Sequence, residues 1–310
     1  MIHRDLISTA ALEGARNLFA PAAIEAVLTA PGFEAYLRAI VRIWPGLEAS
    51  DPVLTEGLRD IERLTGGLAV FHLARSLGGL TVGRLAALFE SIGLAPARAP
   101  ATIKLMRFFN LIEAAEVPGD RRVRAYRPTP RMTTAFIART REELRALTLV
   151  DPHIAQMLPR LDDPEAGAAV VSGIGEFMMA FLSVHGVAGD DTLQSISSRA
   201  SGMPLLGRLL LAGAEEGGPF PPVGRVRFGV TAMAKACGVS RTQVRRILRA
   251  GAGAGHFVLH GEGEVELTPH LAQHVSIYGL STALSLGWSV RHALARFDAA
   301  APAPSGRPKA

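Results

Sequence analysis

The sequence is poor in cysteine and in aromatic residues. Its 310 residues include one cysteine, Cys237, and only 6% are Phe, Trp or Tyr, although 48% are hydrophobic. A single cysteine excludes an intramolecular disulfide framework and a cysteine-based zinc finger, and it fits a reducing cytoplasm. Because aromatic residues are few while Ala, Gly and Leu abound, we expect a mainly α fold with packed helices rather than a β-sandwich or barrel.

Long hydrophobic runs are also scarce. The most apolar segments, such as 203–214, are too short to cross a bilayer, and that segment contains Arg208. The N-terminal residues mix acidic with apolar side chains, unlike a secretion signal. We therefore expect a soluble, cytoplasmic protein with no membrane partner.

The sequence motifs of common enzymes are missing. We find no phosphate-binding loop with its lysine, no nucleophile elbow, no zinc-protease helix and no dinucleotide-binding glycine fingerprint. The glycine run 251–255 lacks the Lys-Ser/Thr of a phosphate-binding loop and is interpreted as a flexible connector. His256 and His260 could meet on one hairpin, but packed or exposed histidines are expected in preference to metal ligands. We predict that the protein is not an enzyme and uses neither a cofactor nor a metal.

Acidic residues are absent between Arg225 and Arg249, a stretch with seven Lys and Arg residues. Solvated helices usually carry opposite charges three or four residues apart, and this stretch lacks such partners. The formal net charge of the whole chain is only +5, so the distribution of charge matters more than its total. This distribution favours a polyanionic partner.

Within this stretch the residue spacing is that of a helix-turn-helix. Ala234 is a small residue where two helices touch, Gly238 allows a tight turn, and Val244 anchors the second helix. Val244, Ile247 and Leu248 then form one apolar stripe, which we expect to be buried.

The opposite face of this second helix is polar and basic, which suits phosphates and base edges. Its first residue, Ser240, is also expected to cap the helix. We predict DNA contacts from this face and from the short strand before it, through Arg225, Arg227, Ser240, Arg241, Thr242, Gln243, Arg245, Arg246 and Arg249.

The first half of the chain contains two amphipathic helices followed by a hairpin. The helices are LTVGRLAALFESIG and RAPATIKLMRFFN, and the second buries either Ile103, Met106 and Phe109 or Leu105 and Phe108. The segment GDRRVRAYRPTPRM and the residues before it indicate two short strands around a Pro-Gly-Asp turn.

This order of helix, helix and basic hairpin resembles the winged helix-turn-helix of MarR-like bacterial transcription regulators, over about residues 66–145. The resemblance implies small β-hairpin wings on a mainly α fold. It also implies that the second helix enters the major groove while the wing reaches a minor groove or the backbone. The residues that would then contact DNA are Arg98, Thr102, Lys104, Arg107, Arg121, Arg122 and Arg124.

The second half of the chain repeats this order. Apolar helices, the strand RVRFGV, the helix-turn-helix and the hairpin HFVLHGEGEVELTP follow one another, and the hairpins end alike in Pro-Thr-Pro and Leu-Thr-Pro. We interpret this as an internal duplication that gives tandem winged helix-turn-helix units. The hairpins differ, because the second carries Glu262, Glu264 and Glu266, which repel phosphate. We therefore expect the second unit to bind mainly through its helix together with Arg225 and Arg227.

The predicted domain organisation places a boundary in the polar, proline-bearing segment after residue 150. The three predicted parts are residues 1–150, an N-terminal helical segment plus a first winged helix (about 66–145); residues 151–298, a linker and helices plus a second winged helix (about 205–275) and C-terminal helices; and residues 299–310, a disordered tail.

The function predicted from these patterns is sequence-specific DNA binding for transcription regulation, in a bacterial cytoplasm and associated with the nucleoid. The alternatives are a replication initiator, a chromosome-organising DNA-binding protein, or a winged-helix protein-interaction module. The expected partner is double-stranded DNA, a small-molecule effector is left unspecified, and the chain acts either as a monomer with a pseudo-two-fold axis (a pseudo-dimer) or as a homodimer.

Overall fold

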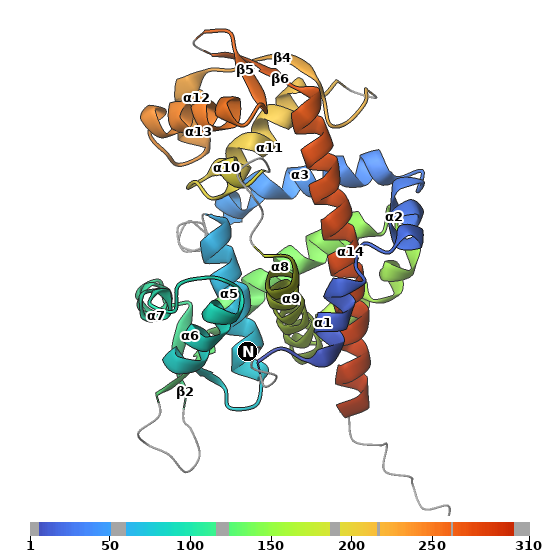
Figure 1. The fold of residues 1–310 in the computed structure, drawn as a ribbon, viewed down its shortest axis with the longest axis vertical. Helices are drawn as coiled ribbons and strands as arrows, with labels where there is room; N and C mark the ends of the chain where they lie inside the picture. Colours follow the sequence, from blue (N-terminus) through green and yellow to red (C-terminus); the bar gives the residue numbers. More distant parts are fainter. Residues whose placement is uncertain are drawn as a thin grey trace, which may run out of the picture.

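The protein is mainly helical, with two small antiparallel sheets of three strands each (Figure 1). This architecture was obtained as a computed structural model. It describes residues 6–50, with side chains to residue 45, and residues 60–115, 124–186, 193–215, 218–261 and 263–300.

The N-terminal half contains seven α-helices and one sheet among its described residues. In chain order they are α1 (Thr9–Arg16), α2 (Pro21–Leu28), α3 (Phe33–Ser50), α5 (Ile61–Arg75), β1 (Leu80–Thr81), α6 (Val82–Ser91), α7 (Arg98–Phe108), β2 (Ile112–Ala115), β3 (Ala125–Pro128) and α8 (Pro130–Leu147).

The rest of the described chain begins with two 3-10 helices and ends with a long α-helix. The elements are η1 (Pro152–Gln156), η2 (Leu158–Asp162), α9 (Pro164–His185), α10 (Gln194–Ser197), α11 (Gly202–Gly213), β4 (Gly224–Arg227), α12 (Val230–Ala236), α13 (Arg241–Gly253), β5 (Phe257–Leu259), β6 (Glu264–Leu267) and α14 (Pro269–Ala300).

The two sheets have the same strand order. In the first sheet β3 lies between β1 and β2, and in the second β6 lies between β4 and β5. In each case two helices separate the first strand from a hairpin, and the strand in the middle of the sheet leads into a long helix, α8 or α14. The paired strands of both predicted hairpins are therefore confirmed, whereas the Pro-Gly-Asp turn of the first lies outside the described residues. The predicted strand RVRFGV is shorter than expected, because α12 begins at Val230, and β1 was not predicted as a strand.

Matching backbone turns connect the helices to each sheet. The turn after α6 has Gly93 at a φ of 78°, and the turn after α12 has Gly238 at 60°. The chain leaves α7 through Asn110 at a φ of 53° and leaves α13 through Gly255 at 76°. These left-handed conformations suit glycine and asparagine, because a β-carbon is costly there for most residues.

Two threonines tie each sheet to the helix that follows it. Thr129 Oγ1 donates to the carbonyl of Asn110 at 3.0 Å, and Thr268 Oγ1 donates to the carbonyl of Gly255 at 2.7 Å. Each hydroxyl also accepts a backbone N–H in the first turn of α8 or α14. The Thr-Pro sequences after the two hairpins thus have the same structural task.

Two reciprocal helix crossings hold the halves of the chain together. Between the halves, α9 packs against α5, and α3 packs against α11. Within its own half, α9 also packs against α14, and α3 packs against α8. A β-carbon at Gly175 of α9 would clash with the carbonyl of Leu68, and one at Gly207 of α11 would lie 3.1 Å from the carbonyl of Val41. Glycine therefore allows the backbones to approach closely at both crossings.

The hydrophobic cores draw on both sides of residue 150. One cluster joins α3, including Tyr36, to α11 and the second sheet, and the other joins the first sheet and α5 to α9. Ile154 and Leu161 are buried in η1 and η2, which pack against α8. The segment expected to be a linker is therefore folded, and the two predicted parts of the chain share their cores.

Helix α9 is long and apolar enough to cross a membrane by length and composition. The expectation that no segment reaches this length was therefore wrong. In the structure α9 packs against α1, α5, α8 and α14 (Figure 1).

A buried polar cluster fixes α9 to its neighbours. Glu176 accepts a hydrogen bond from the backbone N–H of Ser8 at 3.0 Å and pairs with Arg296 of α14 at 2.9 Å. His72 of α5 contacts the carbonyl of Leu6 through Nε2 at 2.5 Å. Burial lowers the pKa of His72. Burial acts to raise the pKa of Glu176, but Ser8, His72 and Arg296 together outweigh it and lower this pKa.

We expect acid to destabilise the fold through these two groups. Because the folded pKa of His72 is lowered, the unfolded chain binds this proton more readily, and stability falls as pH drops below about 6.5. The lowered pKa of Glu176 adds a further loss below about pH 4.5. Partial burial also lowers the pKa of His292, which acts in the same direction as His72.

The measurement is the thermal midpoint between about pH 7.5 and about pH 5.5, followed by circular dichroism. The midpoint of His72→Gln should fall less over this range than that of the wild type. The matched control is His153→Gln, which replaces an exposed histidine and should follow the wild type. Equal pH slopes in all three proteins would contradict the assignment.

Candidate nucleic-acid interface

Helices α12 and α13 form the predicted helix-turn-helix. Ala234 is buried, and its carbonyl accepts the N–H of Val239 at 3.0 Å across the turn that contains Gly238. Ser240 Oγ accepts the backbone N–H of Gln243 at 3.1 Å and so caps α13 as expected. Cys237 is buried at the end of α12, where a small apolar side chain was expected.

Helix α13 has the predicted apolar face. Val244, Ile247 and Leu248 are buried against the second sheet and α12, as the spacing predicted. The opposite side of α13 exposes polar residues. These exposed residues are Ser240, Arg241, Thr242, Arg246 and Arg249.

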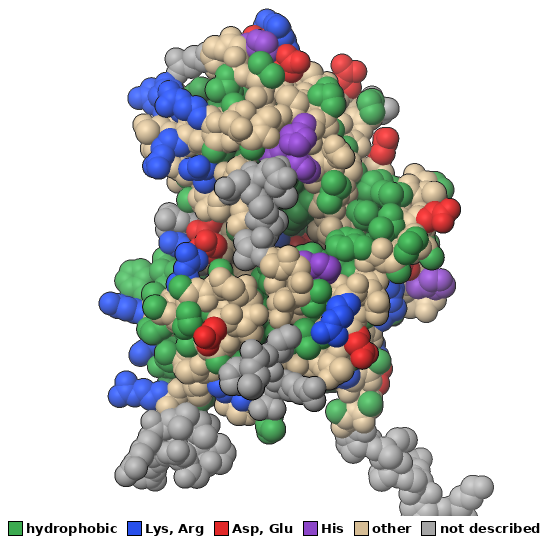
Figure 2. Space-filling view, viewed as in Figure 1, with side chains coloured by type: hydrophobic (Ala, Val, Ile, Leu, Met, Phe, Trp, Pro, Cys, Tyr) green, Lys and Arg blue, Asp and Glu red, His purple; other side chains and the backbone are tan. Residues whose placement is uncertain are grey.

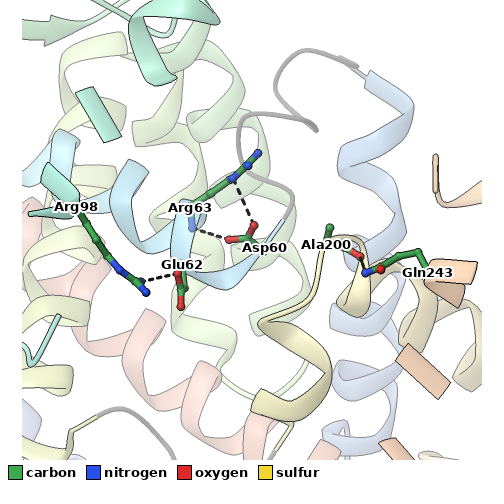
Figure 3. Close-up of polar contacts among 6 residues, drawn as sticks. All are labelled: Asp60, Glu62, Arg63, Arg98, Ala200 and Gln243. Atoms are coloured by element: carbon green, nitrogen blue, oxygen red, sulfur yellow. Dashed lines mark hydrogen bonds and ion pairs between the residues drawn. The ribbon is translucent and has the colours of Figure 1, made fainter. Parts of the chain in front are cut away.

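Two residues expected on this exposed face are half-buried instead. The side-chain amide of Gln243 lies 3.5 Å from the carbonyl of Ala200 and donates to it (Figure 3). Arg245 is also half-buried. The reason is that α10 and the residues after it pack along one side of α13. The outward-facing surface is therefore narrower than the helical period alone predicted.

The arginines of strand β4 have acidic neighbours. Arg225 lies 3.6 Å from Glu264 and 4.0 Å from Glu266, and Arg227 lies 3.6 Å from Glu264. The antiparallel register places these side chains opposite one another. The acids that the sequence lacks near Arg225 and Arg227 thus come from β6, and both arginines are already paired.

The exposed arginines of α13 differ from those of β4. Within the described part of the chain, Arg241, Arg246 and Arg249 form no ion pair with a carboxylate. Their positive charge is therefore not balanced locally, and it faces solvent beside Thr242. Such a surface favours binding of phosphate groups.

Helix α7 buries the first of the two predicted apolar sets. Ile103 and Met106 are buried and Phe109 is half-buried, whereas Phe108 is 80% exposed. Sequence periodicity left the position of Phe108 open. Lys104 and Arg107 are exposed on the same helix, as expected, and the guanidinium of Arg107 lies 5.9 Å from the ring centre of Tyr126.

The other two predicted contacts on α7 are directed toward α5. Arg98 pairs with Glu62 at 2.6 Å, near the start of α5 where Asp60 caps the helix (Figure 3). Thr102 is half-buried, its hydroxyl bonds to the carbonyl of Arg98, and its methyl group faces Gly66 of α5. Thr102 is thus a packing residue in this structure, and Arg98 would have to leave Glu62 to reach another anion.

The first hairpin is described only in part. Arg124 is exposed just before β3, and Arg127 pairs with Glu113 across the hairpin at 2.7 Å. Arg121 and Arg122 lie outside the described residues, as does Glu262 of the second hairpin.

Helices α7 and α13 lie along the same edge of the molecule (Figure 1). Figure 2 shows Lys and Arg side chains gathered over α12 and α13 and again beside α7, with few acidic side chains between them. The structure therefore brings the two predicted basic helices to one side.

Comparisons with known proteins identify no relative. No protein-family model matches the chain, and neither a curated protein nor a solved structure shows significant similarity to it.

The position of α13 depends on a close contact with the second hairpin. The prediction that residues 251–255 form a flexible connector is wrong in part, because α13 continues as a helix to Gly253. Gly251 is buried, and a β-carbon there would clash with the ring of Phe257 in β5 and lie 3.2 Å from Ile196 of α10. Gly253, one half-turn further along the helix, has no such neighbour.

We expect Gly251→Ala to destabilise the protein by about 1–3 kcal/mol, because the added methyl overpacks a buried contact. The matched control is Gly253→Ala, which should stabilise α13 by up to about 1 kcal/mol through helix propensity. Urea unfolding followed by circular dichroism measures both changes. Equal effects of the two substitutions would show that the Phe257 contact does not fix α13.

Proposed function

We propose that the protein is a sequence-specific DNA-binding regulator of transcription. The observation that carries the proposal is the exposed arginine face of α13, which lies on a capped helix-turn-helix and has no acidic partner among the described residues. In winged-helix proteins the second helix of this motif is the element that enters the major groove. Arginine there can bind phosphate or the edge of guanine.

We further propose that one chain carries two winged helix-turn-helix units. The common strand order, the left-handed residues at matching turns and the two threonine bridges support this duplication. The helix packing supports it as well, because α3 contacts α8 and α11 while α9 contacts α14 and α5. Exchanging the two units converts one set of contacts into the other, as a pseudo-two-fold axis requires.

The two candidate reading heads are not equivalent. The first presents Lys104 and Arg107 beside the exposed ring of Phe108, whereas the second presents the arginines of α13 beside an acidic hairpin. Each head would therefore favour a different half-site. In this proposal the chain acts as a pseudo-dimer in a bacterial cytoplasm, associated with the nucleoid and without catalytic activity.

The surface of the first unit favours one alternative. The ring of Phe108 is 80% exposed, which suits a contact with a protein partner. Arg98 is already paired with Glu62, so it is less available to a phosphate. A winged-helix protein-interaction module is therefore the second candidate function. It requires no DNA binding by α13, so the same experiment separates the two functions.

The test is binding of fluorescent genomic DNA fragments by the wild type and by an Arg246→Ala, Arg249→Ala variant. We expect the variant to bind about 10- to 100-fold more weakly, with a smaller dependence on salt, because two phosphate or base contacts are lost. The matched control is Arg145→Ala, Arg160→Ala, which removes the exposed Arg145 and the half-buried Arg160, already paired with Glu142 and Asp298. No DNA binding by the wild type, or equal weakening in both variants, would refute the proposal.

The duplication gives a separate prediction for the footprint on a selected fragment. A single chain should protect two half-sites of different sequence, about one helical turn apart. The Arg246→Ala, Arg249→Ala variant should lose protection at one half-site only. If two chains bind a symmetric palindrome and both halves are lost together, the single-chain arrangement is wrong and the protein binds as an ordinary homodimer.

A further inference from the structure

Three histidines meet where α13, β5 and α14 come together. Ligand nitrogens of His256, His270 and His274 all lie within 4.8 Å of one another. The ring centres are 5.3 Å apart for His256 and His270, 5.2 Å for His256 and His274, and 4.2 Å for His270 and His274. Figure 2 shows a group of histidine side chains at the surface in this part of the molecule.

The three rings come from the connection between α13 and β5, which carries His256, and from α14, which carries the other two. His256 is fully buried, its N–H donates to the carbonyl of Gly251 at 2.8 Å, and its carbonyl accepts the N–H of Thr268 at 3.2 Å. His270 and His274 stand one turn apart on the first two turns of α14. His270 is exposed and His274 half-buried, so the cluster is open to solvent on one side.

We propose that His256, His270 and His274 bind a divalent transition-metal ion of the zinc class. Imidazole is a preferred ligand of zinc, nickel and copper, and a pair four residues apart on a helix presents two rings to one ion. Tetrahedral zinc, with Zn–N distances of about 2.0–2.1 Å, needs nitrogens about 3.4 Å apart, which side-chain rotation from the present positions can supply. The exposed side leaves the fourth position to water or another ligand.

The histidine on the hairpin that sequence analysis paired with His256 does not belong to the cluster. His260 bonds to Glu266 at 2.8 Å instead. The ligand pair of the cluster comes from α14, which the sequence places beyond the hairpin. This is why the cluster was not found from sequence spacing.

The matching place in the first unit shows that the fold does not require histidines here. Aligning Asn110 with Gly255 and Thr129 with Thr268 places Leu111, Arg131 and Ala135 opposite the three histidines. A sheet and helix of the same layout therefore form with no histidine at the junction. The cluster is a separate property of the second unit.

A bound ion would connect the end of α13 to the start of α14. His256 follows α13 by a few residues, and the other two ligands belong to the helix that packs against α9. The ion would thus fix α13 relative to the core. By fixing α13, the ion would also affect DNA affinity. Only this effect on DNA affinity rests on the proposed function.

The test is titration of the metal-free protein with Co²⁺, followed by its visible absorption and by displacement with Zn²⁺. We expect one Co²⁺ per chain with the band intensity of a low-coordinate site, and a higher thermal midpoint when Zn²⁺ is bound. Because loss of an outer-shell partner already weakens metal binding by 10–100-fold, His270→Ala should weaken it by at least about 100-fold. This ring is exposed, so the variant should fold normally.

The matched control is His260→Ala, which removes a histidine from the turn after β5 and should leave Co²⁺ binding unchanged. Absence of the Co²⁺ band in the wild type, or equal binding by the wild type and His270→Ala, would overturn the site. DNA affinity is then measured with and without Zn²⁺. If the protein binds metal but no DNA, the metal site is supported and only the proposed function is refuted.

Discussion

The close crossings of α9 with α5 and of α3 with α11 are the constraint on which the rest of the structure depends. Glycine at Gly175 and Gly207 lets the backbones approach, and the surrounding aliphatic side chains then fill two shared cores. The first sheet is joined to these cores by α5 before it and α8 after it. The second sheet is joined to them by α11 and α14. The placement of α7 relative to α13 therefore depends on helix packing in the core, whereas local contacts such as that of Gly251 with Phe257 hold α13 against its own sheet.

Electrostatics divides the basic residues into two groups. Arg98, Arg127 and the arginines of β4 pair with carboxylates, whereas the exposed arginines of α13 form no ion pair within the described part of the chain. Exposed ion pairs contribute only about 0–1 kcal/mol, so a phosphate can replace a carboxylate at small cost. The unbalanced charge on α13 needs no such exchange, which is why this helix carries the functional proposal.

The two halves share a plan and differ in chemistry. Matching turns at Gly93 and Gly238 and matching threonine bridges give the same local geometry. The two halves differ in the side chains that this shared backbone carries. The first half exposes the ring of Phe108 on α7, and the second has the histidine cluster beside α13. Two halves of one chain can vary independently, whereas the subunits of a homodimer must present identical surfaces.

The sequence by itself determined the local structure. The cap at Ser240, the buried stripe of Val244, Ile247 and Leu248, and the two hairpins follow from interactions between residues close in the chain. Only the tertiary structure decided that Gln243 turns toward Ala200, that Arg227 faces Glu264, and that His256 meets His270 and His274. These contacts join elements whose relative placement depends on the packing of the whole core, which no local pattern encodes.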